Sequence, residues 1–388
     1  WLADSPALGL TAVYYSRDGE LLVAVTDQRL PIDGGSPASQ FARWVEQFQL
    51  AVASPGQVLP LQPECIPKPW GQEIWYTGVE DRGTCGFRLA GGQVPIPWLQ
   101  AVMPDAAAGP AGQALVLLKI LDPCAEEVTG DLYFELHEKK REVYVVTRVD
   151  RAAWPDGVGY IRFGFDPQRI AAAGGEEQFR RQYRAAVADY ERVRRAIDEA
   201  PAGQAVTASL YRRERELRAA MDAYTNLRPL RAGDVVVVPL LMPHSLQHGV
   251  RTIEFQTPVY ERQILSFAQR VLTQDHWDTE RAVAQMRLTP PADEPFPQLT
   301  DGDGLLVERI VDFPDFEVRR VRLEPGAGLA LAPSTDYSVA IVVDGELAVD
   351  GGVFAAEQAF FLPAGWSGRV SATDAAQPLV FLLAMPRS

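Results

Sequence analysis

The sequence predicts a mainly β protein built from two barrels, with an inserted helical hairpin and a small N-terminal α/β module. Three observations predict this fold. Residues 67–165 carry apolar runs bounded by turn residues roughly every eight to twelve positions, which is typical of sandwiches and barrels. Residues 167–227 change to apolar spacings of three and four, which indicates amphipathic helices. Segments 233–244 and 357–368 repeat one turn spacing, so the barrel is expected twice.

The N-terminal residues 1–60 form a separate module in this prediction. Residues 10–25 alternate in polarity around Asp18 and Gly19, which indicates a β-hairpin closed by an Asp-Gly turn. Residues 39–50 show the pattern of a short amphipathic helix, and a proline-bearing linker follows. No chemical motif occurs here, so packing or assembly is the expected role of the module.

The first barrel is predicted over residues 61–290, interrupted by a helical insertion at 166–227. The segment 201–203 contains proline and glycine, and divides the insertion into two helices. Apolar side chains three and four positions apart mark the first of these helices: Phe179, Tyr183, Val187, Tyr190, Val193 and Ile197. A proline-rich linker over 289–297 separates this region from the second barrel, which is predicted over 291–388.

Two short segments carry the residues best suited to chemistry. The chain has four histidines, and two of them, His137 and His244, stand at matched places in glycine-led strand patterns. Glu135 shares a strand face with His137 because strand side chains alternate with period two, and Glu142 precedes the next apolar run. Two imidazoles and two carboxylates suit Zn²⁺, Mn²⁺ or Fe²⁺. The alternative is a pair of core histidines with satisfied hydrogen bonds.

These segments resemble the paired signature of the cupin superfamily. The second segment fits in spacing from Gly233 through Pro239 to His244, although Leu241 replaces an inner glycine. The first segment matches in part, because Glu135 stands where the superfamily has its leading histidine. The resemblance implies two cupin barrels, that is, double-stranded β-helices of the jelly-roll kind.

The predicted second barrel carries the same turn spacing without its histidine. Gly368 stands in segment 357–368 where His244 stands in the earlier segment, and no histidine follows His276. We therefore expect a second cupin barrel that keeps the turns and holds no metal.

A narrower resemblance is to the type I mannose-6-phosphate isomerases. The chain carries a set of elements similar to motifs of that family, in the family's order: residues 67–71, 117–122, 140–142, 233–244, 254–256 and 260–262. The resemblance implies a metal-dependent isomerase of a sugar phosphate, of the type that converts mannose 6-phosphate to fructose 6-phosphate. It implies one divalent metal, Zn²⁺ first and Mn²⁺ or Fe²⁺ otherwise, held by Glu135, His137, Glu142 and His244.

The resemblance also points to catalytic groups. Arg262 is the expected cation beside the reacting carbons, and Glu254 and Lys140 are the pocket residues expected to move protons. The alternatives are a surface ion pair of Arg262 with Glu261, a structural hydrogen bond for Glu254 and a solvated charge for Lys140.

Three further residues are candidates for substrate contact. Lys119 and Lys68 are the candidates for contact with a phosphate, since no glycine-rich phosphate loop occurs in the chain. His248 lies four residues beyond His244 and lines the same pocket if the strand continues that far.

Departures from the family motifs bear on the substrate more than on the metal. Glu135 stands where the family has glutamine, and Tyr133 and Phe134 replace a small pair whose serine helps to hold phosphate. The loop from His137 to Glu142 is also shorter than the family's. These departures favour a second hypothesis, a non-catalytic metal-containing cupin that binds or senses a carbohydrate. A third is an Fe- or Mn-dependent oxygenase, which the identity of the metal distinguishes.

The composition limits the classes of partner that we expect. The net charge of −14 over 388 residues argues against nucleic acid, which needs a basic face, and no apolar run is long enough for a membrane span. Cys65, Cys85 and Cys124 form no Cys-x-x-Cys pair, so reduced thiols and a cytoplasmic location are expected. The expected partner is a small sugar or sugar phosphate, and the expected state is a monomer or homodimer.

Overall fold

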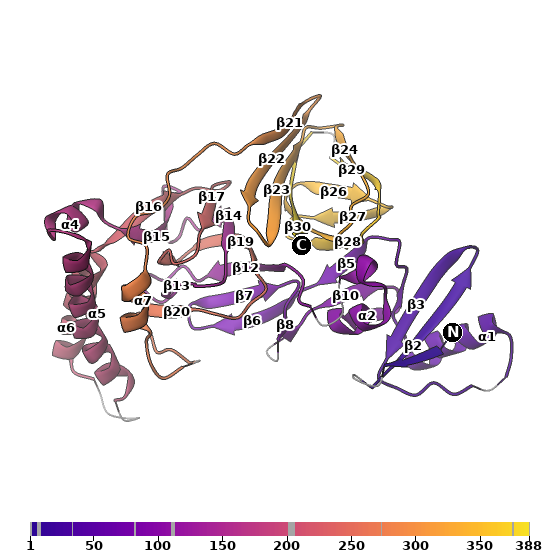
Figure 1. Ribbon diagram of the computed structural model, residues 1–388, viewed down its shortest axis with the longest axis horizontal. Helices are drawn as coiled ribbons and strands as arrows, with labels where there is room; N and C mark the ends of the chain where they lie inside the picture. Colours follow the sequence, from indigo (N-terminus) through magenta and orange to yellow (C-terminus); the bar gives the residue numbers. More distant parts are fainter. Residues whose placement is uncertain are drawn as a thin grey trace. The chain divides into compact units, whose positions relative to one another are not determined.

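The computed structural model describes residues 2–5, 9–32, 34–80, 83–109, 113–200, 206–272, 274–374 and 376–387. It is a mainly β protein, as predicted (Figure 1). The chain divides into two compact units: unit 1 comprises Trp1–Ile66, Ile74–Lys119 and Pro295–Ser388, and unit 2 comprises Pro67–Glu73 and Ile120–Glu294. The boundaries at residues 60 and 290 stay a prediction.

The N-terminal module in unit 1 contains the predicted hairpin and helix. Asp18 and Gly19 both have positive φ, 54° and 87°, as a two-residue hairpin turn of this kind requires. Ser36 caps the helix by accepting a hydrogen bond from the Ser39 amide. The elements are β1 (Leu2–Ser5), β2 (Leu10–Arg17), β3 (Glu20–Thr26), β4 (Val52–Ala53) and α1 (Pro37–Phe48).

The first barrel lies in unit 2 and has two sheets whose side chains share one core. The six-stranded sheet has the order β17 (Val235–Val238), β14 (Glu142–Val149), β19 (Val250–Gln256), β12 (Leu117–Pro123), β7 (Gly71–Trp75), β6 (Glu64–Lys68). The boundary between the units falls within β6, β7 and β12. The five-stranded sheet has the order β16 (Thr225–Leu230), β15 (Gly159–Phe165), β18 (His244–Leu246), β13 (Phe134–Leu136), β20 (Gln263–Ser266).

The strand β13 separates two cores by alternation. Tyr133 belongs to the barrel core, whereas Phe134 and Leu136 belong to the core beneath the inserted helices. Because successive strand side chains point to opposite faces, Glu135 and His137 share the face of Tyr133. The apolar residues on one face thus fix which way the polar residues of the motif point.

The helical insertion is present where the sequence predicts it. Figure 1 shows α5 and α6 side by side, next to the strands of the five-stranded sheet. Phe179, Tyr183, Val187 and Tyr190 are fully buried on one face of α5, as their spacing predicts. The predicted break at 201–203 lies outside the described residues. The helices of unit 2 are α4 (Pro167–Ala172), α5 (Glu176–Asp198), α6 (Ala208–Asp222) and α7 (Thr279–Gln285).

The second barrel lies in unit 1 and repeats the turns of the first. Gly368 begins β29 as His244 begins β18. One sheet has the order β11 (Gly92–Pro95), β10 (Gly86–Leu89), β5 (Leu59–Gln62), β28 (Ala359–Leu362), β25 (Ser338–Asp344), β30 (Leu379–Pro386), β23 (Phe316–Leu323), β22 (Leu305–Asp312), β21 (Gln298–Gly302). The other has the order β24 (Gly328–Leu331), β29 (Gly368–Ala372), β26 (Glu346–Val349), β27 (Gly352–Ala355). Unit 1 also contains α2 (Ile96–Val102), α3 (Asp105–Ala108), β8 (Val79–Glu80) and β9 (Gly83–Thr84).

Gly130, which begins the segment that carries Glu135 and His137, lies where close packing leaves no room for a side chain. A Cβ at Gly130 would lie 2.1 Å from the Cys124 carbonyl oxygen and 2.7 Å from the Cβ of His248. We expect Gly130→Ala to lower the free energy of unfolding by about 1–3 kcal/mol, measured by urea denaturation. Gly56→Ala is the control, since a Cβ there meets nothing within 4 Å. Equal stability of the two variants would contradict this account.

Candidate metal centre

The four predicted ligands come together in the first barrel. Glu135 on β13 pairs in register with His244 at the start of β18. His137 follows β13 directly, and Glu142 begins β14. The two halves of the sequence motif are far apart along the chain, and the pairing of β13 with β18 brings them together.

The distances place the four side chains in one cluster. The Nε2 atom of His137 lies 3.8 Å from Oε1 of Glu135 and 3.4 Å from Oε1 of Glu142. The Nε2 atom of His244 lies 3.0 Å from Oε2 of Glu142. Ligand atoms of Glu135, His137 and His244 all lie within 4.8 Å of one another, so these three residues could hold one metal ion.

The donor atoms of this cluster fit a metal ion. Oε2 of Glu135, Nε2 of His137 and Nε2 of His244 are buried and make no hydrogen bond. A buried polar atom without a partner costs about 1–3 kcal/mol. One carboxylate oxygen and two imidazole nitrogens are a donor set that divalent transition metals bind. The residues present therefore fit the metal that the sequence predicts.

Both imidazoles are oriented by hydrogen bonds at their other nitrogen. Nδ1 of His137 lies 2.9 Å from the Glu261 carbonyl oxygen, and Nδ1 of His244 lies 2.9 Å from the Met242 carbonyl oxygen. Because a carbonyl oxygen only accepts, each Nδ1 donates, and each Nε2 keeps a free lone pair. The carboxylate of Glu261 accepts hydrogen bonds from the amides of Glu138 and Lys139, which anchors the loop.

The environment of His137 and Glu142 favours the protonation states of these two residues that bind a metal. Burial lowers the pKa of His137 well below its usual value, and the charge of Lys140 lowers it further. Burial acts to raise the pKa of Glu142, but Lys140 outweighs it with other contacts, and the pKa lies well below its usual value. A neutral imidazole and an ionised carboxylate are the states that bind a cation.

The pKa of His137 makes the stability of the metal-free protein depend on pH. The unfolded chain protonates His137 near pH 6.5, whereas the folded chain resists protonation. We therefore expect the free energy of unfolding to fall as the pH drops below about 6.5, by up to about 1.4 kcal/mol per pH unit. Urea denaturation of chelator-treated protein from about pH 7 to about pH 5 measures this slope. His137→Gln should flatten the slope, and an unchanged slope in that variant would contradict the assignment.

Two predicted catalytic cations reach the cluster. Nζ of Lys140 lies 2.6 Å from Oε1 of Glu142, and Nη1 of Arg262 lies 3.9 Å from Oε2 of Glu135. The Arg262 guanidinium carbon lies 4.5 Å from the centre of the Tyr133 ring, a cation–π contact. Arg262 thus forms an ion pair with a predicted metal ligand.

The third predicted catalytic residue, Glu254, lies on β19 opposite Tyr144 of β14. Directly paired residues point to the same face of a sheet, so Glu254 faces the side that Tyr144 and Glu142 face. Glu254 is 1% exposed. Burial raises the pKa of Tyr144 well above its usual value, and the charges of Glu142 and Glu254 raise it further, so the phenol stays protonated.

The predicted substrate contacts lie in different surroundings. Lys68 forms an ion pair with Glu73 at 3.2 Å. Lys119 is buried on β12 and belongs to unit 1. β18 ends at Leu246, so His248 does not continue the strand face of His244. Their substrate roles stay predictions.

The His248 ring has its own partners within unit 2. Its Nδ1 lies 2.7 Å from Oδ1 of Asp131, and its ring stacks on Trp154 with the centroids 4.5 Å apart. Trp154 also donates a hydrogen bond from Nε1 to the His248 carbonyl oxygen, at 2.7 Å. These contacts hold the imidazole in a fixed position.

Sequence reasoning missed two residues of the centre. Tyr144 donates a hydrogen bond to Oε2 of Glu142 at 2.7 Å. Its position two residues after Glu142 on a strand is a signal that could have found it. Glu261 supplies the carbonyl that orients His137, and no local pattern marks this role because the contact joins distant segments.

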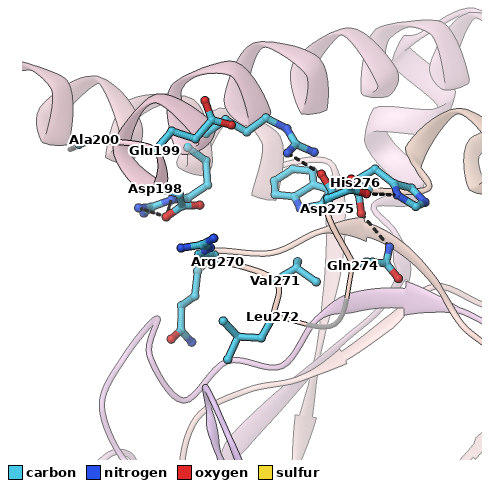
Figure 2. A pocket seen from close by; sticks show the side chains of 13 residues that line it. Asp198, Glu199, Ala200, Arg270, Val271, Leu272, Gln274, Asp275 and His276 are labelled. Carbon is cyan, nitrogen blue, oxygen red and sulfur yellow. Dashed lines mark hydrogen bonds and ion pairs between the residues drawn. The ribbon is translucent and has the colours of Figure 1, made fainter. Parts of the chain in front are cut away.

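Unit 2 also contains a hollow of about 880 Å³ that none of the predicted site residues lines. Figure 2 shows it between the end of α5 and the segment that carries Asp275 and His276. Two pairs of its polar groups contact each other: Arg194 pairs with Asp198 at 2.7 Å, and His276 with Asp275 at 2.9 Å. The side chain of His276 is 64% exposed, as expected of a surface residue.

Two further features bear on the composition-based predictions. Cys65, Cys85 and Cys124 are free thiols. Among the described residues, no helix combines the length and the hydrophobicity that crossing a membrane requires.

Comparison with solved structures shows that the chain shares its fold with phosphomannose isomerases. The mannose 6-phosphate isomerase from Bacillus subtilis aligns with a TM-score of 0.59 at 14% identity, over 84% of this chain and 99% of that one. A variant of the phosphomannose isomerase from Salmonella typhimurium aligns with a TM-score of 0.60 at 14% identity, over 85% and 100%. A zinc-bound mannose 6-phosphate isomerase also aligns with a TM-score of 0.60 at 14% identity, over 85% of this chain and 100% of that one. No family model and no curated protein matches the chain.

Proposed function

We propose that the protein is a metal-dependent aldose–ketose isomerase that acts on a sugar phosphate, in the manner of mannose 6-phosphate conversion to fructose 6-phosphate. The observation that carries the proposal is the group of three buried ligand atoms without hydrogen bonds, in Glu135, His137 and His244. The fold shared with solved isomerases supports it. The proposed setting is cytoplasmic carbohydrate metabolism.

The proposed metal holders are Glu135, His137, Glu142 and His244, with Zn²⁺ as the first candidate and Mn²⁺ or Fe²⁺ as alternatives. A zinc-bound structure among the similar isomerases supports zinc. When bound, the divalent ion polarises a carbonyl and the hydroxyl beside it. The carboxylates of Glu135 and Glu142 are anionic. They neutralise more of the metal's charge than neutral amide ligands, such as the glutamine that the family has in place of Glu135, would. Other cations in the site therefore carry more of the electrostatic stabilisation.

The reaction moves one proton from C2 to C1 of an open-chain sugar, and a second proton from the C2 hydroxyl to the oxygen on C1, through a cis-enediol. Arg262 is the cation proposed to stabilise the enediolate, and its stacking on Tyr133 holds the guanidinium in place. Glu254 is the proposed proton carrier, and its burial keeps bulk water from it. Lys140 is the second proposed carrier, held within 2.6 Å of Glu142.

The phosphate of the substrate is proposed to contact lysine side chains. Lys68 and Lys119 are the proposed cations, and His248 is the proposed neighbour of the sugar. Lys68 is paired with Glu73 at 3.2 Å, so a phosphate on Lys68 has to compete with that carboxylate.

A second candidate function is a metal-containing cupin that binds or senses a carbohydrate without converting it. The contacts of the two cations favour it. Lys140 is engaged by Glu142 and Arg262 lies 3.9 Å from Glu135, so both charges are already partly neutralised by the centre itself. A cation held in this way offers less to a developing enediolate.

Calorimetry combined with product analysis separates the two candidates. Mannose 6-phosphate and unphosphorylated mannose are titrated into metal-loaded protein, and the same mixtures are analysed for the ketose after long incubation. Heat of binding with ketose formed supports the isomerase. Heat of binding without ketose formation would contradict the isomerase proposal and support the carbohydrate-binding candidate.

A further inference from the structure

Tyr144 is a buried phenol that contacts the metal centre and takes no part in the reaction proposed above. It is 4% exposed, and its hydroxyl donates to Oε2 of Glu142 at 2.7 Å. Its ring centre lies 5.9 Å from that of His244. The same carboxylate oxygen lies 3.0 Å from Nε2 of His244, so the phenol of Tyr144 and the imidazole of His244 both contact Oε2 of Glu142.

The two oxygens of Glu142 are held by different donors. Lys140 approaches Oε1 at 2.6 Å, and Tyr144 donates to Oε2 at 2.7 Å. An ionised carboxylate has about four lone-pair positions, so each oxygen keeps one for another partner. Two donors on opposite oxygens fix the plane of the carboxylate as well as its distance. Of the two donors, the Lys140 ammonium is carried by a flexible aliphatic chain, whereas the Tyr144 ring is packed in the barrel core.

Packing and hydrogen bonding of Tyr144 are separable. The ring packs among apolar side chains of the barrel core, including Val146 and Leu121. A phenylalanine would keep this packing and lose the hydroxyl only. A role in filling the core and a role in holding Glu142 therefore predict different outcomes for the same substitution.

We propose that Tyr144 is a positioning residue that fixes the Glu142 carboxylate for the metal. The proposal rests on the proposed function in one respect, the role of Glu142 as a ligand. Hydrogen-bond partners of metal ligands typically contribute about 10–100-fold to metal affinity, because they orient the ligand before the metal arrives. We expect Tyr144→Phe to weaken metal binding by about this factor.

The test is Zn²⁺ affinity by competition with a chelator, and the visible absorption of the Co²⁺-loaded protein. Tyr190→Phe is the matched control, because Tyr190 is also buried and donates to a carboxylate, Glu214, at 3.1 Å. Both variants lose one buried hydrogen bond and should lose similar stability. Tyr144→Phe alone should weaken Zn²⁺ binding and shift the Co²⁺ spectrum.

A double-variant cycle shows whether Tyr144 acts through Glu142. If it does, Tyr144→Phe has no further effect on metal affinity in a protein that already carries Glu142→Ala. Zn²⁺ affinity of Tyr144→Phe within about twofold of the wild type would overturn the inference and leave the proposed function standing. Failure of the wild-type protein to bind Zn²⁺ or Co²⁺ would overturn both.

Discussion

Replacing both His137 and His244 with alanine is expected to abolish stoichiometric metal binding. Their Nε2 atoms are two of the three predicted ligand atoms that are buried and make no hydrogen bond. The effect should exceed the about 10–100-fold typical of residues outside the ligand shell, because donor atoms themselves are lost. The measurement is metal content after dialysis against a weak chelator, together with isomerase turnover. Each single variant should lose most of the bound metal.

The control is His276→Ala, which removes an exposed imidazole from the same unit. Its side chain is 64% exposed and contacts Asp275, and the variant should bind metal as the wild type does. Full metal content in the variant that lacks both His137 and His244 would contradict the assignment of the centre. The pairing of Glu135 with His244 would then serve the fold alone.

Replacing Arg262 with alanine is expected to retain the metal and to lower kcat by about 100- to 1,000-fold, which is typical for removal of a group that stabilises a developing negative charge. The guanidinium lies 3.9 Å from Glu135 and 4.5 Å from the Tyr133 ring centre, so it is held beside the centre without being a ligand. Arg262→Lys should recover part of the loss, because it keeps the charge and loses the planar fork. Steady-state kinetics and metal analysis of the same preparations measure both effects.

The matched control is Arg251→Ala. Arg251 is a largely buried arginine of the same barrel, paired with Asp122 at 2.6 Å. It precedes Glu254 on β19 by an odd number of positions and therefore lies on the other face of the strand. This variant should lose stability and keep kcat. Loss of the metal in Arg262→Ala would show that Arg262 supports the centre rather than the reaction.

The ligand cluster could be predicted from the sequence because strand geometry fixes it. Glu135 and His137 are two residues apart, so alternation puts them on one face wherever the strand lies. Glycine and proline turns around His244 placed it at the start of a strand. The inserted helices followed from the spacing of buried aromatic residues such as Tyr183, since a helix with one apolar face has to cover a core.

Contacts between distant segments could not be predicted in this way. The Glu261 carbonyl meets His137 across a separation that no local pattern spans. The placement of His248 depended on whether β18 continued, and the strand ends at Leu246. The ion pair of Lys68 with Glu73 joins the neighbouring strands β6 and β7, so the register between these strands determines the contact. Lys68 and His248 are residues proposed to contact the substrate, and their surroundings depend on strand ends and strand register rather than on a local sequence pattern.

The most direct measurement is a coupled assay for fructose 6-phosphate formed from mannose 6-phosphate, on protein whose metal content is known. The isomerase proposal predicts turnover that a chelator abolishes and Zn²⁺ restores, with one metal bound per chain. Stoichiometric metal without turnover would contradict the proposal. The barrel and its centre would then serve carbohydrate binding.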